Sequence, residues 1–236
     1  MLRGENLHKR LGRRKIIKGI NVMVRGGEVV GLLGPNGAGK TTTFHILAGL
    51  IFPDEGEVFL DGENLTHLPL YVRARKGIGY LPQEHTLFEE LNVYENLIVV
   101  AEFYPFILKS GKIEEILETL NLARLSTQKA SSLSGGEKRR LEIARLLLLS
   151  PRFLLLDEPF TGIDPRGVEE IKEVIKGLKE KGIGILLTDH NIRDTLEITD
   201  RAYLILDGEI VIQGRREEVI SHPRAIEEYF GKSVCE

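Results

Sequence analysis

A glycine-rich segment that ends in Lys-Thr is the first part of this sequence with residue types that could do chemistry. It reads G-x-x-x-x-G-K-T and comprises Gly34, Pro35, Asn36, Gly37, Ala38, Gly39, Lys40, Thr41 and Thr42. Glycines reach backbone conformations that other residues avoid, so backbone N–H groups can come close to phosphate oxygens. Lys40 would place a positive charge on the β- and γ-phosphates, and the Thr41 hydroxyl would bind Mg²⁺. The segment predicts a P-loop rather than an ordinary glycine-rich turn.

A pair of acidic residues, Asp157 and Glu158, follows the continuously apolar residues 153–156. Two carboxylates at a strand end, far along the chain from a P-loop, form the Walker B pattern. Neighbouring residues of a strand point to opposite sides, so we expect the two carboxylates to act differently. Asp157 would hold Mg²⁺, and Glu158 would accept a proton from the attacking water. The alternative is two solvated acids at the end of a strand.

Three further segments carry candidate site residues. His190 follows the apolar residues 183–187 and is placed to reach a γ-phosphate. Gln83 ends another apolar run, and α/β sheets bind ligands at the carboxyl ends of their strands, so we expect Gln83 to take part in catalysis and in Mg²⁺ binding. A second glycine pair precedes a helical pattern in Leu133, Ser134, Gly135, Gly136 and Glu137. The other five histidines carry no signal beyond their type.

The elements that must position these residues are strands alternating with helices. Apolar residues 29–33 precede the P-loop and a helix-compatible run follows it, which is the context that a P-loop requires. Residues 1–33 predict short strands with turns at Gly4, Gly12, Gly19 and Gly26–Gly27. Past Pro151 the alternation resumes, with a helix after Asp164 and Pro165. The sequence therefore predicts an α/β fold.

Residues 85–150 have a different periodicity of apolar residues, because strand patterns end and three helical patterns follow one another. Asn92 would cap the first helix, Gly111 precedes the second, and the third follows Glu137. The third helix also carries basic residues, which we expect on faces away from its apolar stripe. They are Lys138, Arg139, Arg140 and Arg145. We expect residues 85–150 to form a helical subdomain and residues 1–84 with 151–236 to form the catalytic core.

Composition excludes several classes of function. The chain of 236 residues has 32 basic and 35 acidic residues, a balance that gives no basic surface for nucleic acid. The single cysteine, Cys235, permits no internal disulfide and fits a reducing cytosol. No apolar run is long enough to cross a bilayer, so any membrane association is expected to come through a partner.

Together these segments resemble the ATP-binding-cassette (ABC) ATPase family. The resemblance covers essentially the full chain, and the Leu-Ser-Gly-Gly-Glu segment is its discriminating motif because generic P-loop proteins lack it. It implies a P-loop NTPase (RecA-like) core with an N-terminal antiparallel β-subdomain and an inserted all-helical subdomain. It also implies a head-to-tail homodimer that binds two ATP molecules. Each ATP lies between the P-loop of one subunit and the start of a helix in the other subunit, at Ser134, Gly135, Gly136 and Glu137. Asp164 resembles the loop that contacts the opposite subunit's site.

Within the family, the segments around Gln83, Arg139 and His190 are similar to those of the lipopolysaccharide-export ATPases. Branched-chain amino acid importer ATPases are near neighbours, and a soluble, non-transport ABC ATPase is a further alternative. A GTPase is disfavoured because the sequence has no N-K-x-D motif. The resemblance implies integral membrane permease subunits that dock near Gln83 to Tyr94, a location on the inner face of the cell membrane through those subunits, and no nucleic-acid partner.

Two features depart from the family pattern. Leu11 stands where the family usually has an aromatic residue that stacks on adenine, and loss of stacking weakens base binding by on the order of 1 kcal/mol. Glu89 and Glu90 occupy positions that are basic in the export ATPases. They either require a compensating change in the membrane partner or are acids on a solvated surface.

Overall fold

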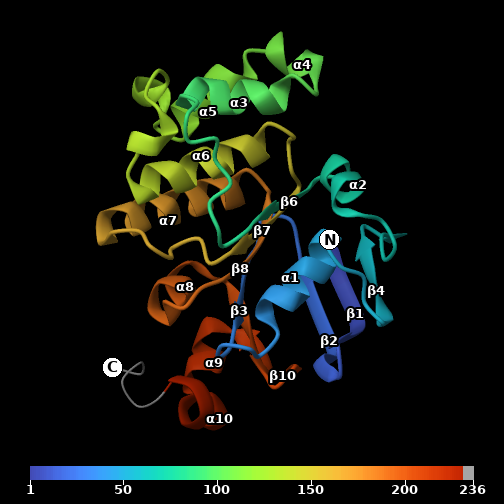
Figure 1. Ribbon diagram of the computed structural model, residues 1–236. Helices are drawn as coiled ribbons and strands as arrows, with labels where there is room; N and C mark the ends of the chain where they lie inside the picture. Colours follow the sequence, from blue (N-terminus) through green and yellow to red (C-terminus); the bar gives the residue numbers. More distant parts are fainter. Residues whose placement is uncertain (231–236) are drawn as a thin grey trace.

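The computed structural model describes residues 1–230, so Cys235 lies outside the described residues. Two sheets and a layer of helices make up the molecule (Figure 1). The α/β prediction is confirmed. Within residues 1–230, no helix combines the length and the apolar character needed to cross a membrane.

The first sheet is antiparallel and comes from the N-terminal part of the chain. Its strand order is β2 (Arg14–Val24), β1 (Leu2–Leu11), β4 (Glu55–Leu60), β5 (Glu63–Asn64). The turn predicted at Gly12 lies between β1 and β2, but the prediction of turns at Gly4 and Gly19 was wrong. Both glycines lie inside long strands, where the β1–β2 register shifts after Gly4 and Gly19 has a φ of 91°. Irregular pairing lets the strands continue past these positions.

The second sheet carries the candidate site. Its six strands, in spatial order, are β10 (Glu209–Arg215), β9 (Arg201–Leu206), β3 (Val29–Leu33), β8 (Gly184–Thr188), β7 (Phe153–Asp157) and β6 (Ile78–Leu81). All neighbours are parallel except β10 and β9. Strands β3, β7 and β8 are buried at every residue, as expected for strands covered on both faces. Their carboxyl ends meet at one edge, which is where the P-loop, Gln83, the Asp157–Glu158 pair and His190 follow.

Six helical segments accompany the two sheets. They are α1 (Lys40–Ala48), α2 (Leu70–Arg75), α7 (Pro165–Glu180), α8 (Ile192–Ile198), α9 (Arg216–Ser221) and α10 (Pro223–Ala225), the last continued by a π-helical turn at Ile226–Phe230. The helix predicted after Asp164 begins as expected, because the Asp164 carboxylate accepts hydrogen bonds from the Arg166 and Gly167 N–H groups and Pro165 occupies the first helical position.

A separate group of helices lies at one end of the molecule (Figure 1). It consists of α3 (Val93–Ala101), α4 (Pro105–Leu108), α5 (Lys112–Thr119) and α6 (Gly135–Leu147), with 3₁₀ turns at Ala123–Leu125 and Ala130–Ser132. Asn92 caps α3 and Gly111 precedes α5, as predicted. The short helix α4 was not predicted, because four residues are too few to show helical periodicity. The apolar faces of α3, α5 and α6 join those of α7, β7 and β8 in one core cluster.

Candidate active site

The P-loop turns sharply after β3 because of three glycines with positive φ. Gly34, Gly37 and Gly39 have φ values of 154°, 76° and 112°. A Cβ atom on Gly34 would lie 2.2 Å from the carbonyl oxygen of Ile205, so a larger residue does not fit there. Gly39 is the N-cap of α1 and provides no side-chain hydrogen bond to the helix. The first N–H groups of α1 therefore lack a side-chain acceptor, and phosphate oxygens are suited to that place.

Lys40 is held inside the loop that precedes it. Its Nζ donates hydrogen bonds to the carbonyl oxygens of Gly34 and Pro35, at 2.7 and 3.1 Å. Burial lowers the pKa of Lys40, while the negative charges of Glu158 and Asp157 oppose this shift. Neutral carbonyl groups are weak partners for a buried ammonium group compared with a phosphate oxygen. The side chain is thus placed to exchange these partners for a triphosphate.

Asp157 ends β7 and is 1% exposed. Burial raises its pKa to about 6, against the effect of a hydrogen bond from the Thr41 hydroxyl. Oδ2 accepts a hydrogen bond from the Tyr80 hydroxyl at 3.5 Å, whereas Oδ1 is buried with no hydrogen-bond partner among residues 1–230. A buried carboxylate oxygen without a partner is costly unless a cation approaches it. Carboxylate and hydroxyl oxygens are ligands that Mg²⁺ prefers, so the pair Asp157 and Thr41 fits that ion.

Glu158 makes the contact that matters most for proton transfer. Its Oε1 lies 2.7 Å from Nε2 of His190, and its Oε2 accepts a hydrogen bond from the Thr161 hydroxyl at 3.2 Å. The sequence analysis placed Glu158 on a strand, pointing away from Asp157, but β7 ends at Asp157. Glu158 instead has a left-handed backbone, with a φ of 54°, which aims its side chain toward His190. Such strained residues occur mainly at functional sites.

One pocket of about 420 Å³ brings half of the predicted site residues together. It is lined by Leu11, Arg14, Ile16, Asn36, Gly37, Gly39, Lys40, Thr41, Thr42, Gln83, Glu158 and His190. Leu11, which the sequence analysis placed at the adenine-stacking position, is half exposed at the rim. Arg14 and Ile16 of β2 lie on the same side. No phenylalanine, tyrosine or tryptophan is among the pocket-lining residues of the described chain.

The second glycine-rich helix end lies in a different place. Ser134 caps α6, where its Oγ accepts a hydrogen bond from the Glu137 N–H and the Glu137 carboxylate accepts one from the Ser134 N–H. A separate pocket of about 290 Å³ is lined by Ser134, Glu137, Asp164 and their neighbours on α6 and α7. Within one chain, Ser134, Gly135, Gly136, Glu137 and Asp164 therefore do not line the P-loop pocket.

Gly135 and Gly136 are also packing residues, which the sequence analysis missed. A Cβ atom on Gly135 would lie 3.0 Å from the Gly162 carbonyl oxygen, and one on Gly136 would lie 3.0 Å from Cα of Gly167. Side chains at either position would push the starts of α6 and α7 apart. The signal was the second pair of glycines at 162 and 167, just before and inside α7.

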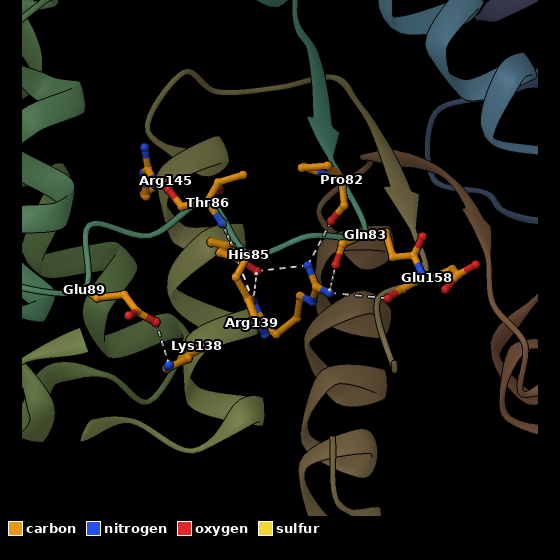
Figure 2. A network of polar contacts seen from close by, with 10 residues as sticks. Pro82, Gln83, His85, Thr86, Glu89, Lys138, Arg139, Arg145 and Glu158 are labelled. Atoms are coloured by element: carbon orange, nitrogen blue, oxygen red, sulfur yellow. Dashed lines mark hydrogen bonds and ion pairs between the residues drawn. The ribbon is translucent and has the colours of Figure 1, made fainter. Parts of the chain in front are cut away.

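Arg139 connects α6 to the segments that follow β6 and β7 (Figure 2). Its side chain is 1% exposed and donates hydrogen bonds to the carbonyl oxygens of Pro82, Gln83 and Glu158, at 3.1, 3.2 and 3.4 Å. It also pairs with Oε2 of Glu142 at 2.9 Å. One guanidinium group thus ties α6 to the backbone on either side of the pocket.

Arg139 and Arg140, which we expected on faces away from the apolar stripe of α6, are both buried. Arg140 pairs with Glu170 of α7. Helix α6 packs against α3, α5, β6 and α7, so little of its circumference faces water. Glu142, three residues after Arg139, was the available sequence signal, because opposite charges at that spacing share a helix face.

The segment after β6 is held along α6 by further contacts (Figure 2). Oε1 of Glu142 accepts a hydrogen bond from the Thr86 N–H at 2.7 Å and lies 3.2 Å from Nδ1 of His85. Arg145 donates to the Thr86 carbonyl oxygen at 2.5 Å and lies over the ring of Phe88. The phenyl ring of Phe88 remains 45% exposed beside this segment.

Glu89 and Glu90 form ion pairs within the chain. Glu89 pairs with Lys138 of α6, and Glu90 pairs with Lys129, each at 3.1 Å. Their side chains are 62% and 87% exposed. Surface pairs of this kind contribute little to stability, about 0 to 1 kcal/mol, so both carboxylates stay available to other partners.

Comparisons with known proteins agree with this geometry. Residues 17–161 match the family model described as ABC transporter. The "Lipopolysaccharide export system ATP-binding protein LptB" of Acidithiobacillus ferridurans is 47% identical over 98% of this chain and 97% of its own length. The ADP-bound ATP-binding cassette MJ1267 superposes with a TM-score of 0.89 and 31% identity, covering 98% and 99% of the two chains. The dimeric, post-hydrolysis cassette MJ0796, bound to ADP and Pi, has a TM-score of 0.77 and 28% identity, covering 92% and 99%.

Proposed function

This chain belongs to the ABC transporter family of ATP-binding proteins, and we propose that it is the ATP-hydrolysing subunit of a transporter for lipopolysaccharide-type export. One observation carries the ATPase assignment: the P-loop, Gln83, Glu158 and His190 line a single pocket at the carboxyl edge of the parallel sheet. The high identity to a lipopolysaccharide export protein along nearly the whole chain supports the substrate class.

In the proposed reaction, the P-loop and Lys40 bind the triphosphate of ATP. Thr41 and Asp157, with Gln83 nearby, would hold Mg²⁺, which would neutralise charge on the β- and γ-phosphates. Glu158 takes a proton from water as the water oxygen bonds to the γ-phosphorus and the bond to the bridging oxygen breaks, which leaves ADP and inorganic phosphate. His190, 2.7 Å from Oε1, holds the Glu158 carboxylate in position.

The active form is a head-to-tail homodimer. In one chain, Ser134, Glu137 and Asp164 line a pocket other than the one lined by the P-loop, and Gly135 and Gly136 do not line the P-loop pocket either. A second copy is therefore needed to bring this helix end to the nucleotide. The dimeric state of the cassette MJ0796 supports this arrangement. Residues 85–150 act as the subdomain that carries the α6 helix end, and residues 1–84 with 151–236 act as the catalytic core.

Integral membrane permease subunits dock on residues 83–94, which places the chain at the inner face of the cell membrane. Phe88 and Tyr94 are 45% and 37% exposed there, unlike the apolar residues of the core. The contacts of Arg139 and Arg145 to this segment give docking a direct route to the pocket. Transport of branched-chain amino acids, or a function outside transport, remains the alternative for the same ATPase chemistry.

The test combines ATP hydrolysis with the identity of the partners. The purified chain should hydrolyse ATP in the presence of Mg²⁺, and purification from the native host in mild detergent should recover polytopic membrane proteins by mass spectrometry. Phe88→Ala should reduce that recovery, whereas Phe103→Ala, which removes a 79% exposed phenyl ring beyond α3, should not. Recovery of ribosomes or DNA-repair proteins without a membrane subunit would overturn the transport assignment, and amino acid permeases would overturn the export assignment.

A further inference from the structure

A buried lysine of α7 lies among three carboxylates from two helices. The Lys172 side chain is 1% exposed, and its Nζ lies 2.8 Å from Glu169, 2.5 Å from Asp194 and 2.7 Å from Glu197. The three carboxylates have ligand atoms within 4.8 Å of one another, an arrangement that repels itself unless a cation lies between them. The ammonium group of Lys172 is that cation, so α8 is fixed to α7 by charge.

The Lys172 ammonium group forms charge-assisted hydrogen bonds with its carboxylate partners. Burial lowers the pKa of Lys172, but hydrogen bonds to Asp194, Glu169 and Glu197 raise it above its ordinary value, so the group is charged at neutral pH. Lys172 is buried, whereas Glu169, Asp194 and Glu197 are 61%, 20% and 45% exposed, so removing the ammonium group leaves three neighbouring carboxylates to repel one another. The ion pair with Asp194 therefore helps to set where the first turn of α8 lies.

Helix α8 is short, so its contacts with the rest of the molecule determine where it lies. It has seven residues, fewer than an isolated helix needs for stability. Its buried residues, Thr195, Leu196 and Ile198, all come after the first turn. In the first turn, Ile192 packs against the core cluster that contains Leu33 and Leu196, and Oδ1 of Asp194 meets Lys172.

From Asp194 a chain of hydrogen bonds runs directly to the candidate active site. Oδ2 of Asp194 accepts a hydrogen bond from the side-chain amide of Asn191, and the Asn191 Oδ1 caps α8 by accepting one from the Asp194 N–H. The Asn191 N–H donates to Oδ1 of Asp189 at 3.0 Å. Oδ2 of Asp189 accepts from the Phe160 N–H at 2.8 Å, two residues after Glu158.

His190 lies between Asp189 and Asn191, and both neighbours are fixed by this chain. The imidazole itself is 48% exposed, and within residues 1–230 its one ion pair or hydrogen bond is the contact with Glu158. The position of the ring is therefore set by the backbone on either side of it rather than by packing around it. A shift of Asn191 moves the ring relative to Oε1 of Glu158.

We propose that Lys172 is a positioning residue for ATP hydrolysis, which holds His190 against Glu158 through Asp194 and Asn191. The proposal rests on the proposed ATPase function. It also links the helix that starts at Asp164, where the second subunit is expected to approach, to the histidine at the γ-phosphate. Lys172 does not line the nucleotide pocket, so it acts through His190 and not on ATP.

The first experiment compares two lysines of α7. Lys172→Met is expected to lower kcat by about tenfold, because displacements well under 1 Å at reacting groups have effects of this size, and to leave the KM for ATP within about twofold. Lys176→Met is the matched control, since Lys176 lies one turn further along α7, is 43% exposed and pairs with Glu173 alone at 2.8 Å. It should leave both constants within about twofold of the wild type.

The second experiment asks whether Lys172 acts through His190. In a His190→Ala background, adding Lys172→Met should lower single-turnover hydrolysis by less than about twofold, because the effects of residues in one chain of contacts are not additive. A full tenfold loss in that background would show a general structural effect and would overturn the proposal. Asp194→Asn, which breaks the same chain at its centre, should reproduce the loss in kcat, so the proposal remains testable if Lys172→Met does not fold.

The outcomes separate this proposal from the ATPase assignment. A wild-type chain that does not hydrolyse ATP would overturn the proposed function. A wild-type chain that hydrolyses ATP, with Lys172→Met and Asp194→Asn both folded and both equal to Lys176→Met in kcat, would overturn the positioning role alone.

Discussion

Helices α1 and α6 both begin after a glycine-rich segment, but their first turns are satisfied in different ways. At α1 the N-cap is Gly39, which offers no side-chain acceptor, and the buried charges of Lys40 and Asp157 lie beside it. At α6 the hydroxyl of Ser134 and the carboxylate of Glu137 form a reciprocal capping box. The N-terminus of α1 is thus open to an anion, whereas that of α6 is already partly satisfied within the chain.

In the proposed head-to-tail dimer, the two helix ends would be unequal parts of one site. The α1 end has a lysine, a candidate Mg²⁺ ligand and the Glu158–His190 pair, so we expect it to bind a nucleotide alone. The α6 end has a hydroxyl and backbone N–H groups close to a second helix, so we expect it to add to a site built by another chain. Variants at the two ends should therefore separate binding from turnover.

The largest effect is expected from removing the chemistry at the α1 end. Glu158→Gln should lower the rate of ATP hydrolysis by roughly 10²- to 10⁴-fold, the usual contribution of a general base, and should leave ATP binding and dimer closure intact. Single-turnover hydrolysis and equilibrium nucleotide binding measure the two properties. Glu90→Gln, on the exposed surface, is the control. Full turnover by Glu158→Gln would show that Glu158 is not the base.

The next largest effect is expected from Arg139, which links the first half of α6 to the backbone beside the P-loop pocket. Arg139→Met leaves the buried Glu142 carboxylate without its guanidinium partner, so the free energy of unfolding should fall by about 3 kcal/mol. Urea denaturation measures this quantity. Lys138→Met, next to it on α6, removes only an ion pair with the exposed Glu89 and should change stability by less than about 1 kcal/mol. Equal effects of the two variants would contradict the role assigned to the buried network.

At the α6 end we expect a loss of turnover without a loss of binding. Ser134→Arg places a long side chain where a second subunit must approach, and should lower ATP hydrolysis by about a hundredfold, comparable with losing one donor to a transition-state oxygen. ATP affinity of the monomer should be unchanged. Ser132→Arg, two residues earlier on an exposed turn, serves as the control. Weaker ATP binding by monomeric Ser134→Arg would mean that Ser134 acts within its own chain.

The smallest change is expected at the rim of the P-loop pocket. Leu11→Tyr supplies an aromatic ring where Leu11 is half exposed, and should tighten ATP binding by about 1 kcal/mol, roughly fivefold. Titration calorimetry with ATP and with its triphosphate moiety alone would assign the gain to the base. Leu50→Tyr, at an exposed position outside the pocket, should leave affinity unchanged. An equal gain for the triphosphate would exclude stacking as the cause.

The sequence predicted what depends on local chemistry. Asn92 and Asp164 begin helices because their side chains accept hydrogen bonds from N–H groups two or three residues away. Strands β7 and β8 were recognisable because every residue in them is buried. Most residues that line the P-loop pocket also come from motifs that can be read locally, but Arg14 and Ile16 do not.

What the sequence did not predict depends on packing between distant segments. Arg139 looks like a surface residue until α3, β6 and α7 enclose α6, and only then do the carbonyl groups of residues 82, 83 and 158 become its partners. Gly4 and Gly19 look like turn residues because strand irregularity depends on register with a neighbouring strand. The left-handed backbone of Glu158 has no signal in its residue type.

The position of β3 in its sheet has a consequence for how the protein is made. β3 leads into the P-loop near the start of the chain, yet its two neighbours in the sheet are β8 and β9, which lie far toward the C-terminus. Synthesis proceeds from the N-terminus at about 5–20 residues per second, so the P-loop strand leaves the ribosome well before its partners exist. Pairing over such long sequence separations is slow and leaves unpaired edges exposed meanwhile. A nascent chain therefore cannot complete its nucleotide pocket, or be stabilised by ATP, until most of its length has been translated.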